Sequence, residues 1–238
     1  MVTGAGRGIG EGIARGFADA GAAIVLAART ANEIESVASS IRDRGGRAVA
    51  VRADVTDTFA LGSLATAAVE EFGHLDIWVN NAGGAEAGKP LAELKRSEWD
   101  SVIDLNFTAV WNGSMAAAEQ MHWGSIINVS SMAAFAAMPG KGHYAACKAA
   151  VVSLTRTMAV ELAPDIRVNA IAPGVIPTRL RFEAADVEGL QLDDLAARVP
   201  LGLGTPADVA AAAVYLASPA AKWVTGQTIQ VSGGIAIV

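Results

Sequence analysis

The chain has few of the residues that build disulfides and metal sites. It holds one cysteine, Cys147, and three histidines, His74, His122 and His143, among 238 residues. A lone cysteine excludes an internal disulfide and is typical of a reducing compartment. The histidines do not have the spacing of metal ligands. We therefore expect no disulfide framework and no metal centre.

An excess of positive charge and long apolar runs are also missing. The net charge of −6 and the isoelectric point of about 5.1 argue against a nucleic-acid partner. Hydrophobic residues reach 52%, largely through alanine. Even so, no run approaches the ~18 apolar residues of a membrane span, and we recognise no signal peptide. We expect a cytoplasmic protein with no membrane partner.

Apolar strand patterns alternate with helical patterns along the whole chain, and no linker divides it. This alternation predicts one α/β domain over residues 1–238, with a doubly wound parallel sheet of about seven strands covered by helices on both faces. The expected strands are Ala23–Ala28, Ala48–Ala53, Ile77–Asn80, Ser125–Ser130, Val168–Ala172 and Thr228–Val231. The expected helices are Ile9–Ala20, Ala31–Arg44, Thr58–Phe72, Asp100–Met121, Tyr144–Ala163 and Asp208–Ala217.

The first strand is unusually short in this numbering. Only Met1 and Val2 precede Thr3, whereas a central strand usually has about five residues. Either the chain is truncated or earlier residues lie outside the numbering.

A glycine-rich turn follows this strand and leads into the first helix. Gly4, Gly8 and Gly10 have the spacing Gly-x-x-x-Gly-x-Gly. A turn without Cβ atoms lets a pyrophosphate approach the backbone and rest on a helix N-terminus. A tight strand–helix connection is the alternative explanation for the same glycines.

Tyr144 and Lys148 form the most informative pair. A phenol has an unperturbed pKa of about 10, and a nearby ammonium lowers that value. In a helix, a separation of four residues places both side chains on one face. Ser131 stands where a predicted strand ends. Alone, the Tyr-x-x-x-Lys spacing is common by chance.

Together, these motifs resemble the short-chain dehydrogenase/reductase family in its single-domain, Rossmann-type form. The matching segments occur in family order over nearly the whole chain: Thr3-Gly4-x-x-x-Gly8-x-Gly10, Asn80-Asn81-Ala82-Gly83, Asn106, Ser131, Tyr144-x-x-x-Lys148 and Pro173-Gly174 with Thr178.

The resemblance implies an enzyme that transfers a hydride between a nicotinamide and a carbonyl carbon. Tyr144 would be the general acid and base, and Lys148 would hold the nicotinamide ribose and lower the Tyr144 pKa. Ser131 would bind the substrate oxygen. Asn106 would bind a water of a proton relay, or would be a buried asparagine bonded to backbone in a helix kink.

Basic residues at the adenosine end favour NADP(H) over NAD(H). No carboxylate ends the second strand, whereas Arg29 follows it and Arg7 lies in the glycine turn. Two guanidiniums can hold a 2′-phosphate. Alternatively, both arginines are solvated surface charges. The further cofactor contacts implied by the resemblance are Ile9, Asp54, Val55, Asn81, Ala82, Gly83, Pro173, Gly174, Ile176 and Thr178. Alternatively, Asn81 ties neighbouring strands together, and Pro173-Gly174 forms an ordinary turn after a strand.

The substrate is less well indicated. Ser130-Ser131-Met132-Ala133-Ala134 and the C-terminal pattern with Ser232 are similar to bacterial hydroxysteroid dehydrogenases. Met132, Phe135, Met138 and Phe182 are candidates for a hydrophobic site, or for the core. A 3-oxoacyl-thioester reductase is the enzyme alternative, with Lys141, Arg179 and Arg181 as its candidate basic patch. A non-catalytic dinucleotide-binding sensor or scaffold is the alternative of another class.

Four further features of the sequence bear on the site and on assembly. Residues 179–199 correspond to the family's mobile substrate lid, or form a surface helix pair. His143 is a candidate substrate contact, and Cys147 is a redox candidate or a small packing residue. Helices Asp100–Met121 and Tyr144–Ala163 look too apolar for one buried face each, so we expect a homotetramer or a dimer.

Overall fold

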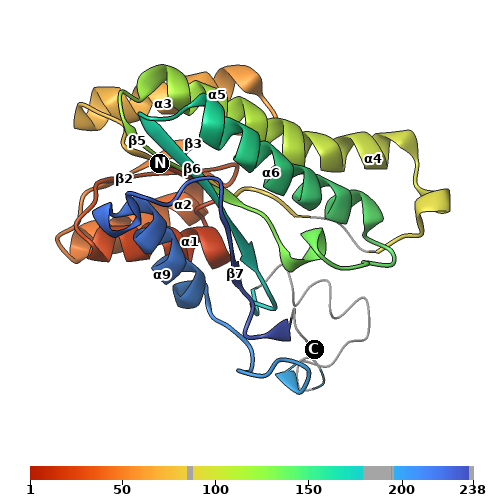
Figure 1. The fold of residues 1–238 in the computed structure, drawn as a ribbon. Helices are drawn as coiled ribbons and strands as arrows, with labels where there is room; N and C mark the ends of the chain where they lie inside the picture. The colour runs from red at the N-terminus through yellow and green to blue at the C-terminus, as the bar shows by residue number, and fades with distance from the viewer. Residues whose placement is uncertain (85–87, 179–193, 195, 236–238) are drawn as a thin grey trace.

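A seven-stranded sheet forms the centre of the computed structural model, which describes residues 1–84, 88–178, 194 and 196–235. The strand order is β3-β2-β1-β4-β5-β6-β7, and every neighbouring pair is parallel (Figure 1). The predicted doubly wound fold is confirmed. The strand order reverses between β1 and β4, which is where ligands bind in open α/β sheets.

Most elements lie within a few residues of their predicted positions. The strands are β1 Val2–Thr3, β2 Ile24–Ala28, β3 Ala48–Arg52, β4 Ile77–Asn80, β5 Gly124–Val129, β6 Ile166–Pro173 and β7 Thr228–Val231. The α-helices are α1 Gly8–Asp19, α2 Ala31–Asp43, α3 Thr58–Phe72, α4 Arg96–Ile103, α5 Ala109–Gln120, α6 Gly142–Glu161 and α9 Pro206–Ala217. Among the described residues, no helix is long and apolar enough to cross a membrane.

Helices cover both faces of the sheet and enclose two apolar cores. In Figure 1, α1, α2 and α9 lie on one face, and α3, α5 and α6 lie on the other. One core joins the sheet to α1, α2 and α9, and includes Ile13, Leu26 and Leu216. The second core joins the sheet to α3 and α5, with Leu64 and Trp78 fully buried. Burial on both sides explains why most residues of the central strands are apolar.

The short first strand pairs on both sides. Val2 is in register with Leu26 of β2 and with Val79 of β4. The backbone of Met1 extends the pairing, since its carbonyl accepts from the Val79 amide at 2.9 Å and its amine donates to the Ile77 carbonyl at 2.8 Å. The backbone of β4 beside β1 is therefore hydrogen-bonded.

The predicted helix Asp100–Met121 is wrong in one important respect. Its span contains the end of α4, a π-helical turn over Asp104–Thr108 (η2) and then α5. The π turn inserts one extra residue into the helical repeat, a feature frequent at functional sites. It places Asn106 inside the protein with no exposed surface.

Candidate active site

A cavity of about 780 Å³ lies along the carboxyl ends of the parallel strands. We call this cavity the cleft. It extends from the glycine turn after β1 to the N-terminal part of α6. Most of the predicted site residues line it: Gly4, Arg7, Gly8, Ile9, Gly10, Arg29, Asp54, Val55, Asn81, Ala82, Gly83, Ser131, Tyr144, Lys148, Pro173, Gly174 and Thr178.

Two predicted site residues do not line the cleft. Ile176 is buried, and its side chain belongs to the core beside α1 and α9. Asn106 is enclosed by backbone: its Nδ2 donates to the carbonyls of Gly84 at 2.7 Å and Val102 at 3.0 Å. Its Oδ1 accepts from the Gly84 amide at 2.9 Å. The structure thus shows the backbone-bonded alternative for Asn106, and the water relay stays a proposal.

The glycine turn brings its backbone unusually close to the neighbouring strand end. Gly4 and Gly8 have φ angles of 63° and 59°, a region that favours glycine. A Cβ on Gly10 would lie 2.2 Å from the Gly4 carbonyl oxygen. The absence of a side chain at Gly10 thus lets α1 begin directly against the end of β1, and the glycines line the cleft as a backbone cradle at the start of α1. This geometry fits a dinucleotide pyrophosphate.

Asn81 ties two strand ends together beneath this turn. Its Nδ2 donates to the carbonyls of Thr3 at 2.9 Å and Gly4 at 3.2 Å. The Thr3 hydroxyl donates to the Val79 carbonyl and accepts from the amides of Asn81 and Ala82. The strand-tying role expected for Asn81 is therefore present, and Asn81 also lines the cleft.

The end of β5 holds Lys148 at two points. Lys148 Nζ donates to the Val129 carbonyl at 3.0 Å, and the Ser130 hydroxyl donates to the Lys148 carbonyl at 2.8 Å. Nζ lies 5.6 Å from the centroid of the Tyr144 ring. Ser131, the next residue, accepts from the Ala133 amide at 3.1 Å. Ser131, Tyr144 and Lys148 therefore meet on one stretch of the cleft.

Burial strongly affects the charge of the lysine. Desolvation lowers the pKa of Lys148 from 10.5 to about 8, and the nearby Cys147 opposes this change. Lys148 thus remains mostly an ammonium at neutral pH. Burial raises the pKa of the Cys147 thiol, whose Sγ lies 3.7 Å from the Val102 carbonyl. A buried thiol with a raised pKa supports the packing role for Cys147.

Charged side chains gather at the end of the cleft formed by the glycine turn and the ends of β2 and β3, where the adenosine of a dinucleotide was expected. Arg7 and Arg29 line it together with Asp54 and Glu33. Hydrogen bonds from the Thr56 amide and hydroxyl lower the pKa of Asp54, and the charge of Arg29 adds to this effect. Glu33 was not predicted from the sequence, because it lies in the first turn of α2 and belongs to no recognisable motif.

Other residues were also missed at the sequence level. The Ser130 hydroxyl donates to the carbonyl of Lys148, and the place of Ser130 beside Ser131 was the available signal. The remaining cleft residues not predicted as site residues come from strand ends, turns and α4–η2: Gly6, Ala28, Thr30, Ala53, Thr56, Ser101, Val102, Asp104, Leu105 and Val129.

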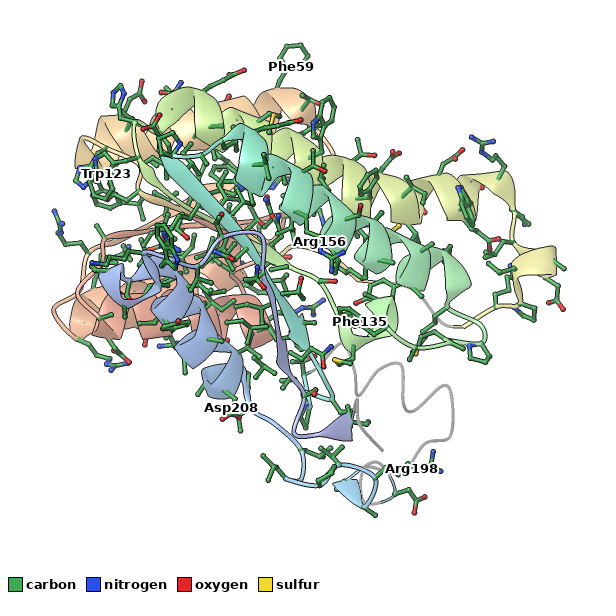
Figure 2. All side chains as sticks on the ribbon, in the orientation of Figure 1. Phe59, Trp123, Phe135, Arg156, Arg198 and Asp208 are labelled. Atoms are coloured by element: carbon green, nitrogen blue, oxygen red, sulfur yellow. The ribbon has the colours of Figure 1, made fainter. Side chains whose placement is uncertain are left out.

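The candidate hydrophobic substrate residues do not gather in the cleft. Phe135 lines a different cavity of about 450 Å³ with Arg156 and residues of β7. Figure 2 shows Phe135 and Arg156 close to α6 and β7. Met132, Met138 and His143 are not among the residues that line the cleft. Phe182, Arg179, Arg181 and most of the predicted lid lie outside the described residues.

Comparisons with known proteins find relatives that match nearly the whole chain. A family model described as enoyl-(acyl carrier protein) reductase matches residues 4–236. Cis-4-hydroxycyclohexanecarboxylate dehydrogenase of Sinomonas cyclohexanicum is 42% identical and covers 100% of this chain and 96% of its own. 3beta-hydroxysteroid dehydrogenase 1 of Eggerthella lenta is 41% identical, and the match covers 100% of this chain and 93% of that protein. A 3-oxoacyl-acyl-carrier-protein reductase of Staphylococcus aureus is 38% identical, and the match covers 99% of this chain and 96% of that protein.

Solved structures show the same fold over the full chain. A short-chain type dehydrogenase/reductase from Mycobacterium marinum has a TM-score of 0.93 at 36% identity, covering 100% of this chain and 94% of its own. An actinorhodin polyketide ketoreductase with NADPH has a TM-score of 0.92 at 31% identity, covering 100% and 96%. The chain belongs to the short-chain dehydrogenase/reductase family, whose members are oxidoreductases that bind a nicotinamide dinucleotide.

Proposed function

We propose that the protein is an NADP(H)-dependent oxidoreductase that interconverts a carbonyl group and a secondary alcohol. The observation that carries the proposal is the meeting of Ser131, Tyr144 and the buried Lys148 in a cleft that begins at a backbone cradle. Gly4, Gly8 and Gly10 would hold the pyrophosphate. The bound cofactor would donate or accept the hydride.

The protein's own part is proton transfer and orientation. Tyr144 gives its phenolic proton to the carbonyl oxygen during reduction and takes it back during oxidation. The Lys148 ammonium, held by the Val129 carbonyl, favours the phenolate and binds the nicotinamide ribose. Because Ser131 Oγ accepts from the Ala133 amide, its own hydrogen can be donated to the substrate oxygen. Asn106 holds the π turn, and a water bound there would link Lys148 to solvent.

The preference for NADP(H) rests on Arg7 and Arg29. Both guanidiniums are exposed at the end of the cleft that starts at the glycine turn. Charge-assisted hydrogen bonds from arginine suit a phosphate dianion. The solved ketoreductase with NADPH supports this choice among nicotinamide cofactors.

For the substrate we propose a hydrophobic ketone or its alcohol, of the size of a ketosteroid or a substituted cyclohexanone. Relatives named for a hydroxysteroid and for a hydroxycyclohexanecarboxylate support this class. A 3-oxoacyl thioester is the second candidate, supported by the Staphylococcus aureus relative. The alternative of another class is a sensor or scaffold, which would bind the dinucleotide but turn over no substrate.

We also propose self-association into a homotetramer or dimer in the cytoplasm. The apolar residues of α6 support association less than expected. Val151, Val152 and Met158 are buried within the subunit, whereas Val160 is largely exposed. The stronger support is on α3 and α5. Phe59 is 89% exposed and Trp111 50% exposed, and a hydrogen bond between Thr58 and Asn112 joins the two helices beside them.

An NADPH-oxidation screen tests the proposed function. The panel holds ketosteroids, substituted cyclohexanones, diketones and 3-oxoacyl thioesters, and each compound is assayed with NADPH and with NADH. We expect turnover of at least one apolar ketone, with a large preference in kcat/KM for NADPH. Binding of NADPH with no turnover of any compound would support the non-catalytic alternative, and equal efficiency with NADH would contradict the cofactor preference.

A further inference from the structure

A third arginine stands behind the adenosine end of the cleft. Arg52 is the last residue of β3 and is in register with Ala28, the last residue of β2. Its Nε donates to the Arg29 carbonyl at 3.1 Å. The Ala53 amide donates to the Ala28 carbonyl at 3.1 Å. Arg52 and the residue after it, Ala53, thus hold the turn that carries Arg29.

The charges at this end of the cleft show why a third arginine matters. Asp54 and Glu33 line the cleft beside Arg7 and Arg29, so two carboxylates oppose two guanidiniums. A Cβ on Gly6 would lie 3.1 Å from Glu33 Oε2, which places that carboxylate against the glycine turn. The formal charges of these four side chains sum to zero, so on their own they would contribute little electrostatic attraction to a phosphate dianion. Arg52 gives this end a positive excess.

Among the described residues, Arg52 has no ion-pair partner. Within the described part of the chain, no ion pair involves Arg7, Arg29 or Arg52. By contrast, Arg42 and Arg44 of the α2 region pair with Glu35 and Asp19. With its Nε on the Arg29 carbonyl, the Arg52 guanidinium is fixed at the turn without lining the cleft itself.

We propose that Arg52 is a positioning residue for cofactor selectivity. It fixes the backbone that presents Arg29 and adds the positive charge that outweighs Glu33 and Asp54, so that a 2′-phosphate is favoured over a free 2′-hydroxyl. This role rests on the proposed preference for NADP(H). It predicts an effect confined to ligands that carry the 2′-phosphate.

Calorimetric binding of two nucleotides tests the proposal without any turnover. Adenosine 2′,5′-bisphosphate and 5′-AMP differ only in the 2′-phosphate. We expect Arg52→Gln to weaken binding of the bisphosphate by about fivefold and to leave 5′-AMP unchanged, because the substitution removes a positive charge near the 2′-phosphate and the Nε hydrogen bond to the Arg29 carbonyl. Arg52→Lys, which keeps the charge and a donor, should recover most of the loss.

Arg47→Gln is the matched control. Arg47 precedes the other end of β3 and lies over the Phe72 ring, 5.6 Å from its centroid, so its removal changes the net charge equally but far from the turn. We expect it to leave the ratio of the two affinities unchanged.

The outcomes separate this inference from the proposed function. A wild-type protein that binds both nucleotides equally would contradict the NADP(H) preference and, with it, the role of Arg52. A wild-type preference that Arg52→Gln leaves intact would overturn the role of Arg52 alone. So would an equal loss for both nucleotides, which is the result expected of a merely structural residue.

Discussion

Lys148 is the residue whose charge depends most on the fold. Its pKa falls from 10.5 to about 8 through burial. Between these values the unfolded chain binds the lysine proton and the folded protein does not, so this residue's contribution to the free energy of unfolding rises with pH. At lower pH the folded protein must hold a buried ammonium.

The difference in unfolding free energy between the wild type and Lys148→Met measures this effect. Chemical denaturation at several pH values from about 8 upward should show the wild type gaining stability relative to the variant, because only the wild type carries the shifted lysine. A difference that is flat with pH would show that Lys148 is not desolvated. A difference that falls with pH would have the wrong sign for a lowered pKa.

Individual site residues differ in how far the sequence could predict them. Tyr144 and Lys148 follow from local spacing, because a helix fixes which side chains share a face. Phe135 could not be assigned this way, since an apolar residue after a strand suits the core, a substrate pocket or the surface equally. Its cavity with Arg156 depends on how β7 returns beside α6, which no local pattern reports.

At the level of single elements, the first turn of α1 depends on the absence of a side chain at Gly10. A methyl group there would lie 2.2 Å from the Gly4 carbonyl and 2.4 Å from Asn81 Nδ2. We expect Gly10→Ala to lower the free energy of unfolding by about 3 kcal/mol and to prevent dinucleotide binding. Denaturant titration measures the first effect and cofactor fluorescence the second.

Gly62→Ala is the matched control within another helix. Gly62 lies in α3, is exposed, and a Cβ there would meet nothing within 4 Å. Alanine should therefore stabilise the protein by up to about 1 kcal/mol through helix propensity. Similar effects of the two substitutions would contradict the close approach at Gly10.

The interrupted helix shows where element prediction fails. The apolar pattern from residue 100 to 121 is continuous, so periodicity predicts one helix. The π turn at Asp104–Thr108 is instead stabilised by tertiary hydrogen bonds between Asn106 and Gly84. These two residues are 22 apart in sequence, and a local window cannot report their contact. The strand ends, by contrast, follow from apolar runs and were predicted within two residues.

For the whole molecule, exposed aromatic residues predict association between copies. Phe59 on α3 and Trp111 on α5 are the exposed aromatic residues that we expect in the interface. Figure 2 shows Phe59 projecting from the surface. In sedimentation at micromolar concentration, the wild type should be a dimer or tetramer, and Trp111→Glu should shift it toward smaller species by placing a charge in an apolar interface. Trp123→Glu, at an exposed residue in the connection between α5 and β5, is the control. A monomeric wild type would contradict the proposal.

Proton transfer by Tyr144 is the central claim for the molecule as an enzyme. The most direct measurement compares wild type and Tyr144→Phe on a ketone that the wild type reduces, with NADPH affinity determined for both. The account predicts that Tyr144→Phe loses at least about 100-fold in kcat, while NADPH still binds with nearly unchanged affinity. Turnover that survives in Tyr144→Phe at close to the wild-type rate would contradict it.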